Sequence, residues 1–352
     1  MTRLKTTIWA AMVAFAWGGV CCGATIEMVT VGDPGNAADT EVMYDGSTGY
    51  GRVDYVYRIG KYEVTNGQYR EFLNAKAALG DPYALYNWGD MPGTEMDRVF
   101  SGITQTGSGT PEDPFVYTPK DDDPAWDTKP VNFVSWFDCL RFVNWLQNGQ
   151  GDGDTESGTY TILNGGPNAG EVLLPTPAER ASWTTPHYVL PTEDEWYKAA
   201  YYKGGSLDAG YWDYATQSDE PPDNNVPEQD TGNSANYFDY DPDDYGYAIG
   251  APYYCTDGGA YALSEGPYGT FDQNGNLSEF LERFDGVAVR LRGGHLGGGT
   301  QYMPPTIYTP LGPAIESSAS GFRVGNVPEP GTLSLLALGL TWLTLRCWLR
   351  QR

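Results

Sequence analysis

Residues 268–279 of this 352-residue chain read Tyr268-Gly-Thr-Phe-Asp-Gln-Asn-Gly-Asn-Leu-Ser-Glu279, and Arg292-Gly-Gly294 follows shortly after. The oxygen donors in this stretch are spaced as a loop around a hard cation needs them. Carboxylates stand at Asp272 and Glu279, and a turning backbone between them can aim the carbonyls of Gly275 and Leu277 inward. Calcium takes about six to eight oxygen ligands, often with a glycine where the loop bends. We therefore predict a calcium-bound loop. The alternative is an ordinary Asn-Gly turn between two strands, with both carboxylates solvated.

The motifs in and around this loop resemble those of the formylglycine-generating-enzyme, or sulfatase-modifying-factor, family. The C-terminal motifs are the loop itself, Arg292-Gly-Gly294 and Gly321-Phe-Arg-Val324. The N-terminal motifs precede it in the family's order, and they are Lys61-Tyr-Glu-Val-Thr-Asn66, Pro130-Val-Asn-Phe-Val-Ser-Trp136 and Leu190-Pro-Thr-Glu-Asp-Glu-Trp196. The resemblance spans about residues 50–325. It implies an α+β, irregular, loop-rich C-type-lectin-like fold with few short helices and small antiparallel sheets.

The resemblance also implies a second calcium site. In the family an asparagine side chain and the carbonyl that follows it bind calcium, which corresponds to Asn236 and Tyr237 in this sequence. A later acid completes the set. By position this acid is Asp244, which we take as the candidate, or Asp257.

The composition fits such a fold and argues against two other classes. The chain has 45 glycines, 25 prolines, 26 tyrosines and 11 tryptophans, so we expect few helices, many turns and an aromatic core. Disordered chains are poor in aromatic residues, which argues against disorder. The net charge of −25 repels nucleic-acid phosphates, so no nucleic-acid partner is expected.

Capping boxes predict where three helices begin. Thr65 with Gln68 and Thr192 with Glu195 can exchange side-chain and backbone hydrogen bonds, and Ser135 caps the apolar pattern that follows it. Residues 25–60 alternate apolar and polar side chains and predict two or three strands. Residues 76–129 and the Gly- and Asn-rich insertion between Gln147 and Pro186 are predicted to be irregular.

The two ends of the chain are predicted to be targeting signals and not parts of the folded domain. Residues 1–24 have a positive start, an apolar core and a small-residue cleavage site, as a secretory signal peptide does. Residues 327–352 combine Val327-Pro-Glu-Pro330 with an apolar run and terminal arginines. This tail is similar to the PEP-CTERM sorting signal of Gram-negative bacteria, which anchors a protein in the inner membrane until an exosortase-type protease removes it. The alternative is a plain C-terminal anchor. We expect an exported domain, residues 25–326, that reaches the cell surface or the extracellular matrix.

The catalytic residues of the resembled family are missing from this sequence. Those enzymes oxidise a cysteine of a client sulfatase with copper(I) held by two cysteines shortly after Arg-Gly-Gly. Here no cysteine lies between Cys255 and Cys347, and copper(I) needs soft thiolate ligands. Relatives that use iron bind it with histidines, whereas this chain has only His187 and His295. Copper or iron is therefore not expected, and calcium is expected as a structural ion.

For the two arginines of the C-terminal motifs, Arg292 and Arg323, we expect a structural role in which each pairs with a buried carboxylate.

Two functions from different classes remain open. The first is a calcium-stabilised surface module, without formylglycine-generating activity, that binds a glycan, peptide or matrix component. The second is an exported oxygenase or other protein-modifying enzyme of the same superfamily with an unrecognised metal site.

Of the cysteines in the mature chain, Cys139 lies in an apolar helix pattern and is expected to be a buried free thiol.

Overall fold

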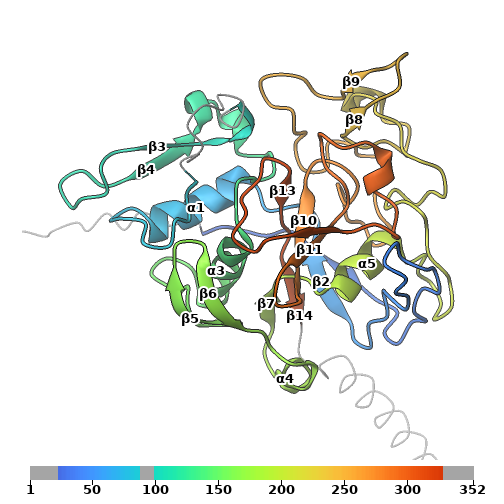
Figure 1. The fold of residues 1–352 in the computed structure, drawn as a ribbon, viewed down its shortest axis with the longest axis horizontal. Coiled ribbons are helices and arrows are strands. Elements are labelled where there is room, and N and C mark those ends of the chain that lie inside the picture. Colours follow the sequence, from blue (N-terminus) through green and yellow to red (C-terminus); the bar gives the residue numbers. More distant parts are fainter. Residues whose placement is uncertain (1–22, 88–98, 328–352) are drawn as a thin grey trace, which may run out of the picture.

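A computed structural model describes residues 23–87 and 99–327 of the chain, and Figure 1 shows how its elements are arranged. Almost all of the predicted signal peptide and of the sorting tail lies outside these residues. The structure is α+β, with a few short helices and small, mainly antiparallel sheets joined by long loops. The predicted fold class is therefore confirmed.

The central sheet joins the two ends of the domain. Its strands are β1 (Met28–Val31), β2 (Tyr57–Gly60), β14 (Gly325–Val327) and β7 (His187–Val189), in that order. Every neighbouring pair is antiparallel. The last described strand thus lies between a strand from the start of the domain and one from its middle.

The second sheet carries the loop from which the sequence analysis began. Its strands are β12 (Thr309–Leu311), β11 (Val289–Arg292), β10 (Ser278–Phe284) and β13 (Ser320–Gly321), in that order. Only the β10–β13 pair is parallel. Strand β10 begins inside the predicted calcium loop, and β11 ends where the Arg-Gly-Gly motif begins. The sheet therefore holds these two motifs side by side, with Glu279 opposite Arg292 in the register.

Capping boxes start the predicted helices as expected. Helix α1 (Asn66–Lys76) follows Thr65, α3 (Trp136–Gln147) follows Ser135, and α5 (Glu193–Tyr201) follows Thr192. In each helix the cap hydroxyl accepts the N3 backbone N–H, and the N3 side chain accepts the cap's own N–H, which satisfies two otherwise unpaired donors. Helix α3 packs against β7 and α5 against β10.

The segments predicted to be irregular contain more order than the sequence pattern indicated. Strands β3 (Ile103–Thr106) and β4 (Val116–Pro119) form one hairpin, and β5 (Thr161–Gly166) and β6 (Ala169–Leu173) form another. The insertion also contains α4 (Pro177–Ser182), which Thr176 begins with a fourth capping box. A hairpin whose strands have two residues each, β8 (Phe238–Asp239) and β9 (Gly246–Tyr247), lies at one edge of the molecule (Figure 1). Short 3₁₀ turns occur at Lys120–Asp122, Pro124–Trp126, Pro227–Gln229 and Thr300–Tyr302.

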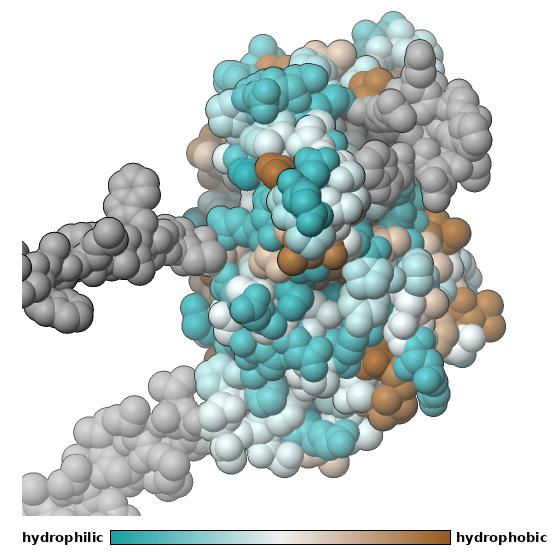
Figure 2. Space-filling model, turned by 90° about the vertical axis from the view of Figure 1, so that its left-hand side faces the viewer, coloured by the Kyte–Doolittle hydropathy of each residue, from teal (hydrophilic) through white to brown (hydrophobic). Residues whose placement is uncertain are grey.

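Aromatic side chains from the two main sheets and two helices fill the largest core cluster. Phe72 of α1, Phe142 and Trp145 of α3, and Phe322 between β13 and β14 have ring centroids 5.3–5.6 Å apart in successive pairs. Such edge and offset contacts add to the burial of apolar area. The face of the molecule in Figure 2 is mostly hydrophilic, with apolar side chains in small separate patches. Among the described residues, no helix has both the length and the apolar character that a membrane span requires.

Candidate functional site

The loop before β10 turns sharply because three of its residues adopt a left-handed backbone. Asp272, Gly275 and Asn276 have φ values of +60°, +85° and +48°. A Cβ on Gly275 would lie 2.4 Å from the carbonyl oxygen of Asn236, so only glycine fits there. Gly275 and Asn236 form a parallel bridge, in which the Asn276 N–H donates to the Asn236 carbonyl at 2.8 Å. The structure therefore brings the two predicted calcium-binding segments into direct contact.

Glu279, a predicted calcium ligand, forms a buried ion pair with Arg323. The Nε and Nη2 atoms of Arg323 donate to the two carboxylate oxygens, each at 2.6 Å. The Trp196 indole N–H donates to the same carboxylate at 2.8 Å. Both charged side chains are almost completely buried. The predicted pairing of Arg323 with a buried carboxylate is confirmed, and most of the hydrogen-bonding capacity of Glu279 is used inside the protein.

Glu63 is a further buried carboxylate of this site that the sequence analysis did not single out. It accepts the Leu277 backbone N–H at 3.1 Å and an N–H of the Asn276 amide at 3.4 Å. Burial, and then the nearby charges of Glu279 and Asp272, raise its pKa well above the usual range. Its signal in the sequence was its place in the Lys61-Tyr-Glu-Val-Thr-Asn66 motif. Three carboxylates therefore share one buried guanidinium, that of Arg323.

Asp272 occupies the turn at the start of the loop. Its Oδ2 atom accepts the Gly259 backbone N–H at 2.6 Å. Burial is the main cause that raises its pKa to about 6, and the Gly259 N–H and the Arg323 charge oppose this rise. Since desolvation disfavours the charged form, a neighbouring cation or a proton would stabilise this carboxyl group.

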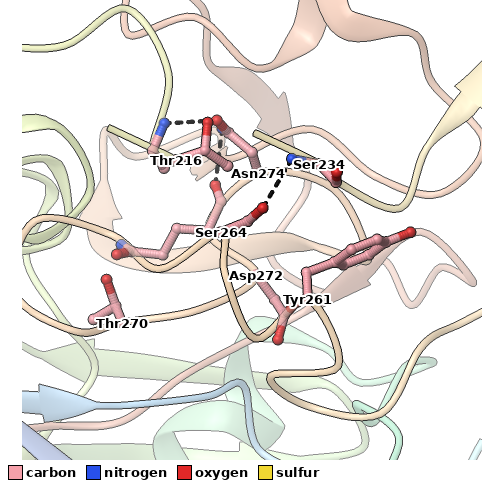
Figure 3. A pocket seen from close by; sticks show the side chains of 9 residues that line it. Thr216, Ser234, Tyr261, Ser264, Thr270, Asp272 and Asn274 are labelled. Carbon is pink, nitrogen blue, oxygen red and sulfur yellow. Dashed lines mark hydrogen bonds between the residues drawn. The ribbon is translucent and has the colours of Figure 1, made fainter. Parts of the chain in front are cut away.

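Asp272 also lines a cavity of about 10 Å³, which has room for one water-sized guest. Figure 3 shows its wall, which includes hydroxyl groups from three separate segments of the chain. Two buried oxygens of the wall, Thr270 Oγ1 and Gln273 Oε1, have no hydrogen-bond partner within the described residues. The lining residues are Ala215, Thr216, Ser234, Tyr261, Ser264, Thr270, Asp272, Gln273 and Asn274.

The residues of the second predicted calcium site lie in two different environments. Asn236 is buried, and its side-chain N–H groups donate to the Tyr254 carbonyl and to Asn276 Oδ1. Its own Oδ1 atom has no partner among the described residues. Tyr237 follows it in a buried position, whereas Asp244 is exposed in the β8–β9 turn. The alternative acid, Asp257, accepts hydrogen bonds from Lys129 and Thr128.

The segment after Arg292-Gly-Gly294 contains no thiol. Arg292 pairs with the buried Glu193 at 2.8 Å, which confirms the predicted structural role of this arginine. His295 is half-buried, and its Nδ1 atom accepts the Gly297 backbone N–H at 3.2 Å. Met303 is completely buried in a cluster with Tyr214, Ala235 and Tyr237. In the described part of the chain, no group of three or more His, Cys, Asp or Glu side chains is placed to hold a metal ion. A cation site there would have to complete its ligand set with carbonyl and amide oxygens beside at most two such side chains.

The two described cysteines, Cys139 and Cys255, are buried free thiols in different hydrophobic clusters. Cys139 Sγ donates to the Ser135 carbonyl at 3.2 Å, as expected for a structural thiol. Cys255 packs against Leu277 and Leu296. Burial raises the pKa of both thiols well above the usual range, so both remain protonated.

The model of the sulfatase-modifying factor enzyme 1-like domain matches residues 29–326. This chain belongs to the sulfatase-modifying-factor family. The match covers the two main sheets, the three predicted helices and both motif-bearing halves. The resemblance of the domain to this family is therefore confirmed.

Solved structures similar to this family member have low sequence identity. CarF matches with 18% identity, 87% of this chain, 99% of the other chain and a TM-score of 0.47. PvdO from Pseudomonas aeruginosa matches with 16% identity, 87% and 96% coverage and a TM-score of 0.48. Treponema denticola variable protein 1 matches with 18% identity, 86% and 95% coverage and a TM-score of 0.43. No curated protein matches the chain significantly.

Proposed function

We propose that this sulfatase-modifying-factor domain is an exported, calcium-stabilised surface module that binds a glycan, peptide or matrix component and does not generate formylglycine. The observation that carries the proposal is the segment after Arg292-Gly-Gly294, where a buried methionine and a glycine-rich loop stand in place of a thiolate pair. Copper(I) is a soft ion that oxygen and amide ligands hold poorly. The two described cysteines are protonated and lie in separate clusters, which supports the same conclusion.

Two features of the site support calcium as its structural ion. Asn236 Oδ1 is a buried amide oxygen without a partner among the described residues, and calcium prefers such ligands. Glu63, Asp272 and Glu279 place three buried carboxyl groups near one guanidinium, that of Arg323, and burial raises the pKa of Glu63 and of Asp272. A hard cation near the two touching segments would stabilise the charged forms of these groups. The proposed ligands are Asp272, Gly275, Leu277 and Glu279 for the first ion, and Asn236, Tyr237 and Asp244 for the second.

Metal analysis and thermal unfolding of the full chain test the calcium part of the proposal. We expect bound calcium without stoichiometric copper or iron, and a higher melting temperature in calcium than in chelator. A ligand that binds only the native state adds about 2.7 kcal/mol when its concentration is 100 times its Kd. The Asn236→Leu variant should lose this calcium-dependent increment. The control Asn74→Leu, which removes amide hydrogen bonds from α1, should keep it. Identical melts of the wild type in calcium and chelator would overturn the calcium proposal.

Incubation with a cysteine-bearing peptide and copper tests the catalytic part. We expect the peptide mass to remain unchanged. Copper-dependent conversion of the cysteine to an aldehyde would overturn the proposal and favour the oxygenase hypothesis.

The proposed route to the surface rests on the two terminal signals. We expect the mature protein to begin near Thr25, and an exosortase-type protease to separate the inner-membrane tail from the domain in a Gram-negative host. N-terminal sequencing and the mass of the secreted form check this route. An uncleaved tail in a host with such a protease would contradict it.

A further inference from the structure

The β8–β9 hairpin displays a cluster of aromatic side chains on the molecular surface. Phe238 lies at its centre, with the ring centroids of Tyr240, Tyr245 and Tyr247 at 4.8, 4.9 and 4.7 Å. The three tyrosines are 56%, 67% and 37% exposed. We call these four residues the aromatic platform. Isolated exposed apolar residues are ordinary, but a contiguous group of large rings marks an interaction site.

The aromatic platform is attached to the loop that follows Arg292-Gly-Gly294. The Phe238 backbone N–H donates to the Gly298 carbonyl, and the Tyr240 hydroxyl donates to the Gly297 carbonyl, both at 3.1 Å. Tyr247 packs against Tyr254 with ring centroids 5.0 Å apart. These contacts hold the rings in place before any partner arrives. Less side-chain freedom is then lost on binding, which favours affinity.

In the stretch of sequence that contains the platform, every charged residue is acidic. Between Lys203 and Arg283 the sequence has no lysine, arginine or histidine. Four acids belong to the hairpin itself, and Asp241, Asp243 and Asp244 are exposed there. The acids of this segment are Asp208, Asp213, Asp219, Glu220, Asp223, Glu228, Asp230, Asp239, Asp241, Asp243, Asp244, Asp257, Glu265, Asp272, Glu279 and Glu282.

Local hydrogen bonds fix two of the hairpin carboxylates beside the rings. Asp239 Oδ1 accepts the Asp241 N–H at 2.7 Å, and Asp241 Oδ1 accepts the Asp243 N–H at 3.0 Å. The Tyr237 hydroxyl donates to the second oxygen of Asp239 at 3.5 Å, whereas Asp241 uses only Oδ1 in these bonds and offers its Oδ2 to a partner. The surface thus combines exposed ring faces with fixed negative charge.

This combination fits the side chains of a basic peptide. A guanidinium group stacks on aromatic faces and forms paired hydrogen bonds with carboxylates, and an ammonium group is attracted by both features. Anionic polymers are repelled by the same charges. A neutral glycan could stack on the rings but would gain nothing from the net negative charge. Resting on the proposed role as a binding module, we propose that the aromatic platform binds arginine- and lysine-bearing segments of a partner protein.

Binding of labelled peptides to the full chain tests this proposal. We expect octa-arginine to bind, octa-lysine to bind more weakly, and added salt to weaken both. Octa-glutamate and a neutral chitin oligosaccharide should not bind. The double variants Tyr240→Ala/Tyr245→Ala and Asp241→Asn/Asp243→Asn should each weaken octa-arginine binding by about tenfold or more.

Matched controls separate the platform from general surface effects. Tyr44→Ala removes another exposed tyrosine, and Glu112→Gln/Asp113→Asn removes two exposed acids from the β3–β4 hairpin. Both controls should bind octa-arginine within about twofold of the wild type. Unchanged melting temperatures show that all four variants are folded.

Several outcomes would overturn the inference. They are failure of the folded wild type to bind octa-arginine, equal weakening by the controls, or binding of the neutral oligosaccharide instead. Calcium dependence and the absence of aldehyde formation would still support the proposed function in these cases. Conversely, platform-dependent peptide binding by a chain that converts cysteine to an aldehyde would overturn only the proposed function.

Discussion

Glu279 on β10 and Arg323, between β13 and β14, form a doubly hydrogen-bonded ion pair in the centre of the protein, with both donor–acceptor distances at 2.6 Å. The arginine also donates to the carbonyls of Gly60 and Phe271 at 3.0 and 2.9 Å. One guanidinium therefore connects the central sheet, the second sheet and the loop before β10. Its position explains why the sheets meet where the candidate calcium segments lie.

Replacing one partner of this pair is expected to be costly. Glu279→Gln keeps the size of the side chain but leaves the buried guanidinium without its closest counter-charge, so we expect a loss of about 3 kcal/mol in the free energy of unfolding. Urea denaturation measures this loss. The exposed pair Lys61–Glu27 supplies the control, because Glu27→Gln should change stability by less than about 1 kcal/mol. Equal losses for the two variants would contradict the structural role of the buried pair.

Gly275→Ala tests the close approach between the loop and Asn236. The new Cβ would lie 2.4 Å from a backbone oxygen at a φ of +85°, so we expect a loss on the order of 3 kcal/mol or more. Gly286 has a similar φ of +94° but open space around it. Gly286→Ala should therefore cost only about 1 kcal/mol. Thermal melts of the two variants separate the clash with the Asn236 carbonyl from the strain of a positive φ, which both positions share. A similar loss of stability in both variants would argue against the close contact between Gly275 and Asn236.

Stability in chelator should fall as the pH rises from 4 to 6. Burial raises the pKa of Asp272 to about 6 in the folded state, whereas the unfolded chain releases this proton near pH 4. The folded state therefore binds more protons in this range, and the free energy of unfolding decreases with pH by up to roughly 3 kcal/mol for this group. Asp272→Asn should remove that part of the slope. Asp113→Asn, on the exposed β3–β4 hairpin, should leave it unchanged. A slope in Asp272→Asn equal to that of the wild type would refute the assignment, since other buried acids such as Glu63 supply only the remaining part.

The helix caps offer a test of local structure. Ser135 is buried, and its hydroxyl donates to the Asp138 carboxylate at 2.7 Å as well as capping α3. Ser135→Ala should cost about 2 kcal/mol, because a buried carboxylate loses a donor in addition to the cap. The exposed cap of α4 should cost about 1 kcal/mol in Thr176→Ala. Chemical denaturation measures the loss of unfolding free energy in each variant. A larger loss in Thr176→Ala than in Ser135→Ala would contradict the role of the buried cap.

The features predicted correctly from sequence are those that neighbouring residues determine. The caps at Thr65, Ser135 and Thr192 act on residues three positions ahead, so their motifs suffice. The same motif stands at Thr176, but the Gly- and Asn-rich composition around it favours a loop, so the pattern alone does not predict α4.

The features that the sequence did not reveal depend on distant residues. Glu63 became part of the site only because the fold brings it to Leu277, far along the chain. The Gly321-Phe-Arg-Val324 motif joins two strands of different sheets, because β13 pairs with β10 whereas β14 pairs with β2 and β7. The chain changes sheets between them, and no local periodicity encodes that change. The sequence does not predict the exposed aromatic platform either. In strands of only two residues, the alternation of apolar and polar side chains does not tell which face is exposed to solvent.

Strand β14 fills the middle of the central sheet although it is the last described strand. Residues 325–327 must therefore be present before this sheet can close, since they are the only link between β2 and β7 in the described sheet. Folding intermediates that lack this strand expose two open edges, which are prone to pairing with other chains. Closure of the central sheet thus waits for residues 325–327.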